Sequence, residues 1–213
     1  MINQIKILLR EALLDEEAKR MSSLPESTGL FIRPINAGAS MTLYDPQSNT
    51  AFGTITFSSH ITLGPYFNVG GVAALRGYGP FIYELAMMYA DSHNSMLMPS
   101  RDGDVRGDAW NVWVNFFNRD DVNKNTLKLE DDLFRFDIIT GDEWDIDYEE
   151  KLEYWNEEID EEDRRALLTF NTGYSLSPNG DYQELIKRAE AQSMRIKDIA
   201  DQKGEELWEE MYD

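Results

Sequence analysis

The sequence predicts an α+β fold: a mixed, mostly antiparallel sheet flanked by helices, followed by an acidic, mainly helical C-terminal extension. The first observation is a series of strand-like segments separated by turn-forming residues, at 30–34, 40–44, 51–57 and 67–75. The second is the helical spacing of apolar residues in 80–90 and 104–118. The third is the order strand, glycine turn, helix and short strand (96–98), which indicates a βαβ crossover within the sheet.

Residues 2–21 place their apolar side chains on one helical face, which predicts an amphipathic helix. Residues 22–29, SSLPESTG, then interrupt regular structure. Within 51–57, threonines alternate with Ile55 and Phe57, as in a strand with one buried face. Residues 45–49, DPQSN, have the turn chemistry that joins this strand to the preceding one as a hairpin.

The two central helices differ in their apolar pattern. Residues 80–90 are apolar around most of the helix, so we expect this helix to be covered on more than one side. Pro80 suits its first position, because the missing N–H would have no acceptor there. In 104–118, Asp104 is a candidate N-cap. The apolar residues there form one stripe: Val105, Ala109, Val112, Trp113 and Phe116.

The pattern is less regular beyond residue 128, which we take as a domain boundary between a core (1–128) and the C-terminal extension (129–213). Within the extension, the sequence predicts an edge strand at 129–139, a short helix at 163–170, a loop at 171–180 and a long helix at 181–211. Gly204 is expected to bend or break the long helix.

The chain of 213 residues has a net charge of −20, and most of it falls in one segment. Residues 130–163 contain 17 acidic and two basic residues, a net charge of −15. Such a surface repels nucleic acid and anionic lipid, and it suits a basic protein partner. A solvated acidic face and a mimic of DNA are the alternatives.

Cysteine is absent and only two histidines are present, which argues against disulfides, thiolate metal sites and a histidine-rich zinc site. No segment approaches the roughly 20 apolar residues of a membrane span, and the first 20 residues do not resemble a secretory signal. We therefore expect a cytoplasmic protein without a metal. Asp102, Asp104 and Asp108 fit turn and capping roles better than a metal site, and His60 fits an ordinary polar role.

The turn Arg76-Gly77-Tyr78-Gly79 connects the fourth strand to the helix at 80–90. A glycine turn at a helix start directs backbone N–H groups and the positive end of the helix dipole to one point, which suits a phosphate or diphosphate. The simpler alternative is a turn that needs two glycines, followed by an ordinary core helix.

Residues 76–81, RGYGPF, and residues 106–113, RGDAWNVW, resemble two motifs of the GNAT acetyltransferase superfamily: the loop that binds the acyl-CoA diphosphate and a later helix. The glycine turn and the run NRDDV at 118–122 are also similar to GNAT-like proteins of tailed bacteriophages. The resemblance covers residues 51–122. It implies a GNAT-like sheet and, for a phage protein, a place in the host cytoplasm or the virion.

The resemblance also implies transfer of an acetyl group from acetyl-CoA to an amine. Backbone N–H groups would polarise the thioester carbonyl in one place and bind the diphosphate in another. The implied residues are Val69, Gly70 and Val72 for the carbonyl, and Arg76, Gly77, Tyr78 and Gly79 for the diphosphate.

The sequence departs from the family pattern at several positions. Phe81 replaces the last glycine of the loop, Pro80 removes an N–H donor, and Arg106 replaces an asparagine. Trp113 stands where the family has the tyrosine that protonates the leaving thiolate. Tyr78, Tyr83 and His93 are other candidates for that role, and the sequence alone assigns it to none of them.

Two functions fit these observations. One is an acyl-CoA-dependent N-acyltransferase with an unidentified amine acceptor. The other is a GNAT-like fold without catalysis, which acts as a structural module or binds a host protein, with the acidic segment 130–163 as a surface for a basic partner. A DNA-mimicking inhibitor is a third, weaker fit, because the charge is local.

Overall fold

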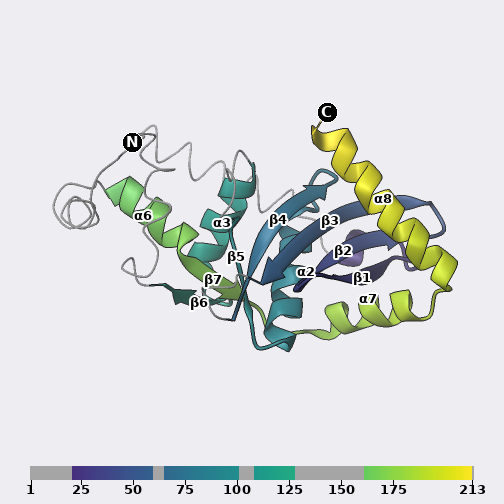
Figure 1. Cartoon of the computed structure of the whole chain (residues 1–213), viewed down its shortest axis with the longest axis horizontal. Coiled ribbons are helices and arrows are strands. Elements are labelled where there is room, and N and C mark those ends of the chain that lie inside the picture. The colour runs from purple at the N-terminus through teal and green to yellow at the C-terminus, as the bar shows by residue number, and fades with distance from the viewer. Residues whose placement is uncertain (1–20, 60–64, 101–107, 128–160, 213) are drawn as a thin grey trace.

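The computed structural model describes residues 21–59, 65–100, 108–127 and 161–212 (Figure 1). In this part of the chain, seven strands form one sheet in the order β1-β2-β3-β4-β5-β7-β6. The strands are β1 (Gly29–Ile35), β2 (Gly38–Asp45), β3 (Thr50–Ser59), β4 (Tyr66–Ala74), β5 (Met96–Met98), β6 (Asn123–Thr126) and β7 (Thr172–Ser175). The helices are η1 (Met21–Ser23), α2 (Gly79–Ser92), α3 (Asp108–Asn118), α6 (Glu161–Phe170), α7 (Gly180–Glu190) and α8 (Met194–Tyr212).

The sheet is mixed and mostly antiparallel, so the predicted α+β class is confirmed. Strands β1 to β4 pair in sequence order as an antiparallel meander, and β4 and β5 are parallel neighbours connected through α2. The four strands predicted between residues 30 and 75, the hairpin between β2 and β3, and the short strand at 96–98 are confirmed.

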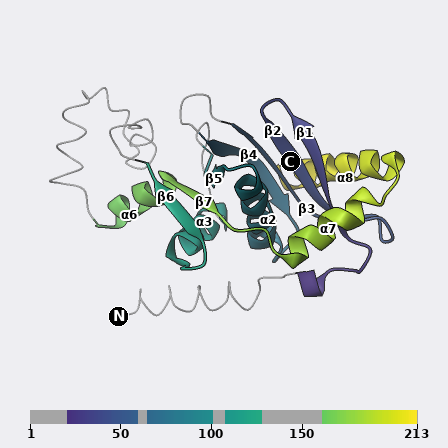
Figure 2. The ribbon, with the colours of Figure 1, turned by 90° about the horizontal axis from the view of Figure 1, so that it is seen from below.

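Helices cover both faces of this sheet (Figures 1 and 2). Helix α2 packs on β3, β4, β5 and β7, and most of its side chains are buried in the main core, as its apolar circumference predicts. Helix α8 packs on β1 to β4, where Ala200 and Leu207 join a second buried cluster. Leu30 belongs to the main core and Phe31 to the second cluster. Because successive strand residues point to opposite faces, the two clusters lie on opposite sides of the sheet.

The long helix predicted at 181–211 is two helices, α7 and α8. The predicted break at Gly204 is wrong, because Gly204 lies inside α8. The chain turns between α7 and α8 at residues 191–193, where the Ile196 N–H donates to the Ser193 hydroxyl (3.4 Å) and its backbone carbonyl (3.0 Å). Gly204 lies inside α8, against the sheet. A Cβ there would be 2.5 Å from Thr42 Oγ1 and 3.0 Å from Thr54 Oγ1. This glycine therefore permits close packing of α8 on β2 and β3.

The prediction of a loop over 171–180 is wrong for Thr172–Ser175, which form the buried strand β7 between β5 and β6. Tyr174 of β7 pairs with Leu97 of β5. Strand β6, which the sequence analysis did not predict, pairs antiparallel with β7. The sheet and its covering helices therefore continue past the boundary predicted at residue 128.

Several sequence-based predictions lie outside the described residues: nearly all of the helix at 2–21, the strand at 129–139, nearly all of the acidic segment 130–163, and the side chains of His60, Asp102, Asp104 and Asp108. Among the helices that the structure describes, none is both long and apolar enough to span a membrane. No three described His, Asp or Glu side chains are grouped as metal ligands would be.

The turn between β2 and β3 is organised by the buried carboxylate of Asp45. It accepts hydrogen bonds from the hydroxyls of Ser27 and Ser48 and from the backbone N–H groups of Gln47 and Ser48. Burial alone would raise the pKa of Asp45, but these donors together lower it below its ordinary value of 3.8. The carboxylate therefore favours the folded state only while it is ionised.

Replacing Asp45 by alanine is expected to lower the free energy of unfolding at neutral pH by about 2–3 kcal/mol, because hydrogen bonds to a buried charge are lost. The folded pKa lies below the unfolded one, so this contribution is present above the unfolded pKa and is lost as pH falls through the folded pKa. Urea unfolding at neutral pH and at about pH 3, below the ordinary pKa of 3.8, should show a smaller difference between variant and wild type in acid. An equal difference at both pH values would contradict this role.

Candidate functional site

The candidate site begins where β4 separates from β5. Their parallel pairing is limited to Tyr66–Asn68 against Met96–Met98, although β4 continues to Ala74. From Val69 onward, the edge of β4 that faces β5 has no strand partner in the described part of the chain. Backbone N–H and C=O groups on such an edge must bind water, side chains or a ligand.

Gly70 forms a β-bulge at this point of separation. Thr56 of β3 pairs with Gly71 and Phe57 pairs with Val69, so Gly70 is the extra residue. Gly70 is exposed, whereas a Cβ on Gly71 would lie 2.1 Å from the Trp208 ring of α8. A bulge disrupts the ladder locally and redirects backbone groups. One side of the bulge is therefore covered by Trp208 of α8, and Gly70 stays accessible.

The glycine turn follows β4 and is held by local hydrogen bonds. The Leu75 N–H donates to the Phe52 carbonyl (2.9 Å), and the Tyr78 N–H donates to the Leu75 carbonyl (2.9 Å). The second of these hydrogen bonds closes a four-residue turn from Leu75 to Tyr78. Gly77 is the third residue of that turn and has φ of 86°. A positive φ at that position is typical of a type II turn and favours glycine. The sequence therefore determines this turn locally.

Helix α2 begins immediately after the turn with an uncapped N-terminus. Tyr78 is the N-cap residue, and its side chain makes no capping hydrogen bond. The first N–H groups of a helix have no acceptor within the helix, and the dipole there is positive. A Cβ on Gly79 would meet no atom of the described residues within 4 Å, so this part of the chain leaves space beside the helix end.

The predicted binding residues lie on β4, in the turn that follows it and at the first position of α2. Val69 is buried in the core and Val72 packs against it. The Tyr78 ring is buried against Phe52 (5.1 Å between centroids), and its hydroxyl donates to the Ser23 carbonyl (3.3 Å). Tyr78 therefore holds the turn to the segment before β1. The Arg76 side chain is exposed beside the turn.

The other two sequence candidates for a proton donor, Tyr83 and His93, lie in the core and at the far end of α2. Tyr83 is buried in the core against Trp113 (5.0 Å between centroids). Trp113 is 1% exposed and also packs on Tyr174 (5.2 Å), as its place in the apolar stripe predicts. His93 is at the C-terminal end of α2, stacked on Tyr89. A 14-residue helix is about 20 Å long at 1.5 Å per residue, so His93 is far from the glycine turn.

Sequence reasoning missed a second polar group, centred on Arg119. Its guanidinium binds Asp121 through two hydrogen bonds (2.9 and 2.6 Å) and also donates to the buried Glu84 of α2. The contacts with Asp121, and next those with Glu84, raise the pKa of Arg119 further above its ordinary value. The three residues border a polar cavity of about 350 Å³. Because carboxylates already bind the guanidinium on two sides, we assign the group a structural role.

Comparison with known proteins adds no relative: no family model, curated protein or solved structure matches this chain. A function is therefore inferred from the geometry around β4 and α2.

Proposed function

We propose that the chain is a GNAT-like, acyl-CoA-dependent N-acyltransferase that acts on an amine. The observation that carries this proposal is the coincidence of three features: the separation of β4 from β5 after Asn68, the bulge at Gly70, and the open, uncapped N-terminus of α2. In sheets with a crossover helix, ligands bind beyond the carboxyl ends of parallel strands, beside the helix N-terminus.

The described residues fit an acyl-CoA through backbone donors. The turn and first helical residues, Gly77, Gly79 and Phe81, offer N–H groups for a diphosphate. Gly70 and its neighbours offer N–H groups for the oxygen of a thioester carbonyl, where negative charge develops during attack by an amine. Acyl-CoA would supply the acyl group as a thioester; the attacking amine loses a proton and the departing thiolate gains one.

A second function, binding without catalysis, is favoured by the packing of Trp113, which stands at the family's proton-donor position, and of the candidates Tyr83 and Tyr78. Trp113 is fully packed in the core, Tyr83 is buried beside it, and the Tyr78 hydroxyl donates to Ser23. A protein that kept the GNAT-like sheet and lost acyl transfer would tolerate these arrangements. It would act as a structural module or bind a protein partner, such as a basic one at the acidic segment 130–163.

Replacing Gly79 by aspartate is the matched test of the binding site. Asp at the first helical position favours the helix dipole, so the fold is preserved while a negative charge enters the diphosphate position. We expect calorimetric titration of wild type with acetyl-CoA to saturate, and the variant to bind at least about tenfold more weakly, or about 1.4 kcal/mol.

Gly180→Asp is the control, because Gly180 is also the first residue of its helix, α7, and a Cβ there would meet no atom of the residues that the structure describes within 4 Å. It should bind acetyl-CoA as wild type does. Equal binding by both variants and wild type would show that the cofactor does not use α2. An absence of wild-type binding at millimolar acetyl-CoA would favour the non-catalytic function.

A further inference from the structure

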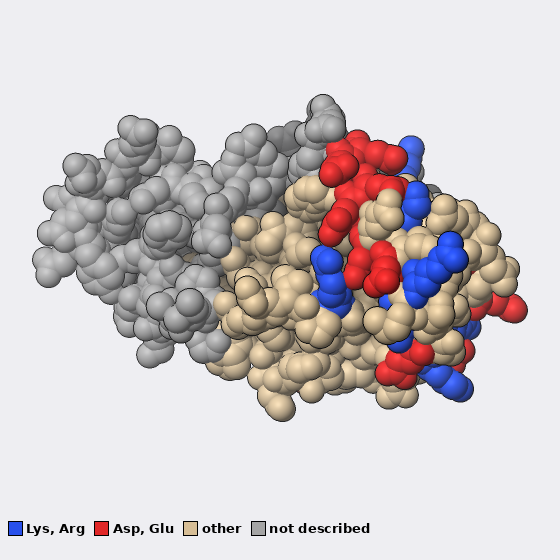
Figure 3. Space-filling model, turned by 45° about the vertical axis from the view of Figure 1, so that its right-hand side comes forward, with Lys and Arg blue, Asp and Glu red and all other residues tan. Residues whose placement is uncertain are grey.

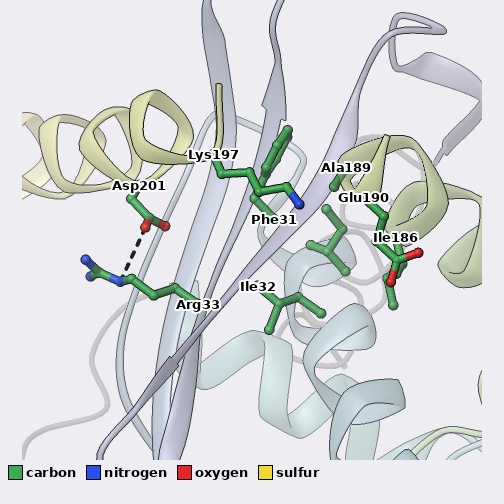
Figure 4. Close-up of a pocket in the computed structure, with 9 residues that line it drawn as sticks. Phe31, Ile32, Arg33, Ile186, Ala189, Glu190, Lys197 and Asp201 are labelled. Carbon is green, nitrogen blue, oxygen red and sulfur yellow. Dashed lines mark ion pairs between the residues drawn. The ribbon is translucent and has the colours of Figure 1, made fainter. Parts of the chain in front are cut away.

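A separate cavity of about 180 Å³ lies between β1, α7 and α8 (Figure 4). Its apolar wall is formed by Ile32 of β1 with Ile186 and Ala189 of α7. Strand β1 is the terminal strand of the sheet and is three strands away from β4. The cavity is therefore distinct from the proposed acyl-CoA site, and the inference below does not depend on that site.

The cavity follows from how α7 meets the edge of β1. Helix α7 packs on β1, and near Gly29 a Cβ would lie 2.9 Å from the Ala189 nitrogen. The chain then turns away into α8, which leaves a gap along Leu30 to Arg33. Pro34 has no N–H for β2, so its nitrogen faces outward. The alternation of an antiparallel pair then directs the backbone groups of Leu30 and Ile32 outward as well, toward this gap.

Charged groups of both signs surround the apolar wall. Arg33 pairs with Asp201 (Nε to Oδ2, 3.5 Å) and with Glu205 (Nη2 to Oε1, 3.4 Å). By contrast, Lys197 and Glu190, which Figure 4 shows on opposite helices at the cavity, form no ion pair with any residue in the described ranges. Burial raises the pKa of Asp201, the nearby Arg33 lowers it, and the neighbouring Glu205 and Asp198 raise it further.

Acidic and basic side chains also lie beside each other on the surface around the cavity. Figure 3 shows a strip of acidic side chains with basic side chains beside it, on the side of the molecule that carries α7 and α8. A ligand of single charge would therefore meet one favourable and one unfavourable neighbour. A ligand that carries both charges and an apolar group can pair with Lys197 and with Glu190 while its apolar group packs on the apolar wall.

We propose that this cavity binds a small apolar α-amino acid as its zwitterion. The carboxylate pairs with Lys197, the ammonium group pairs with Glu190, and the side chain packs on Ile32 and Ile186. The volume fits: about 180 Å³ is close to the roughly 150 Å³ that holds benzene and below the roughly 300 Å³ of drug-sized pockets.

Calorimetric titration of the full chain with L-leucine, leucinamide and N-acetyl-leucine tests the two charge contacts separately. Leucine should saturate at about millimolar concentration, as expected of a small site. Leucinamide lacks the carboxylate and N-acetyl-leucine lacks the ammonium group, so each should bind about tenfold more weakly. Lys197→Met and Glu190→Gln should each weaken leucine binding by a similar factor, whereas Lys187→Met, at an exposed position on α7, should not.

Each alternative result overturns the proposal in a different way. No saturable binding of leucine, phenylalanine or methionine means that the cavity is not an amino-acid site. Unchanged leucine binding by Lys197→Met means that the ligand lies elsewhere. Equal affinity for N-acetyl-leucine and leucine would mean that the ammonium group makes no contact in the cavity. The ligand would then be the carboxyl terminus of a peptide and not a zwitterion. Folding of each variant is checked by its thermal transition, which should match wild type because neither side chain forms an ion pair within the described part of the chain.

Discussion

Replacing Arg119 by methionine is expected to lower the free energy of unfolding by about 3–5 kcal/mol, because the change leaves the Glu84 carboxylate buried without its cation. The Glu84 side chain is only 9% exposed, whereas that of Asp121 is 64% exposed and stays hydrated when Arg119 is lost. The cost therefore comes from Glu84. Urea unfolding at neutral pH measures it.

A double variant separates this explanation from a general packing defect. Arg119→Met combined with Glu84→Leu removes both charges, and replacing a buried ion pair by apolar residues is often neutral. We expect the double variant to recover most of the lost stability. Arg165→Met is the surface control: Arg165 is exposed and its hydrogen bond to Asn118 is too, so its loss should cost less than about 1 kcal/mol. A single variant as stable as wild type would mean that Glu84 is hydrated.

Replacing Trp113 by alanine is expected to destabilise the fold by about 3–5 kcal/mol, the usual cost of removing a large buried aromatic side chain. Trp113 lies between α2 and β7, with Tyr83 at 5.0 Å, Tyr174 at 5.2 Å and Phe116 at 6.2 Å between ring centroids. Loss of the ring opens a cavity at the centre of this aromatic cluster.

The same variant tests whether Trp113 belongs to the acyl-CoA site, as its alignment with the family tyrosine would imply. The packing seen here predicts a large loss of stability and unchanged acetyl-CoA affinity in the protein that remains folded. Trp110→Ala is the control, because Trp110 is only half-buried, beside Phe170, and its removal should cost roughly half as much. Weakened cofactor binding with little loss of stability would place Trp113 at the site instead.

Local signals explain which elements the sequence predicts correctly. The alternation around Ile55, the turn after Asp45 and the glycine turn before α2 are each set by residues close in sequence. The turn of the proposed site is predicted for the same reason, since Gly77 has a positive φ and Gly79 begins the helix. The directions of the backbone N–H groups in this turn follow from these local conformations.

Long-range packing explains what the sequence did not reveal. Strand β6, NKNT, is exposed throughout and has no apolar pattern; it is a strand because it pairs with β7. Strand β7 contains Gly173, which suggests a loop, yet a Cβ there would lie 2.5 Å from the Tyr66 ring. Gly204 similarly serves close packing rather than a helix break. The contact between Glu84 and Arg119 joins residues 35 positions apart, which no local pattern indicates.

The most direct test of the central claim is an amide NMR titration of the whole chain with acetyl-CoA. We expect saturable shifts concentrated at Gly70 and Gly71 in the bulge and at Gly77, Gly79 and Phe81 around the start of α2. Shifts confined to other regions, or none at millimolar acetyl-CoA, would contradict an acyl-CoA site between β4 and α2.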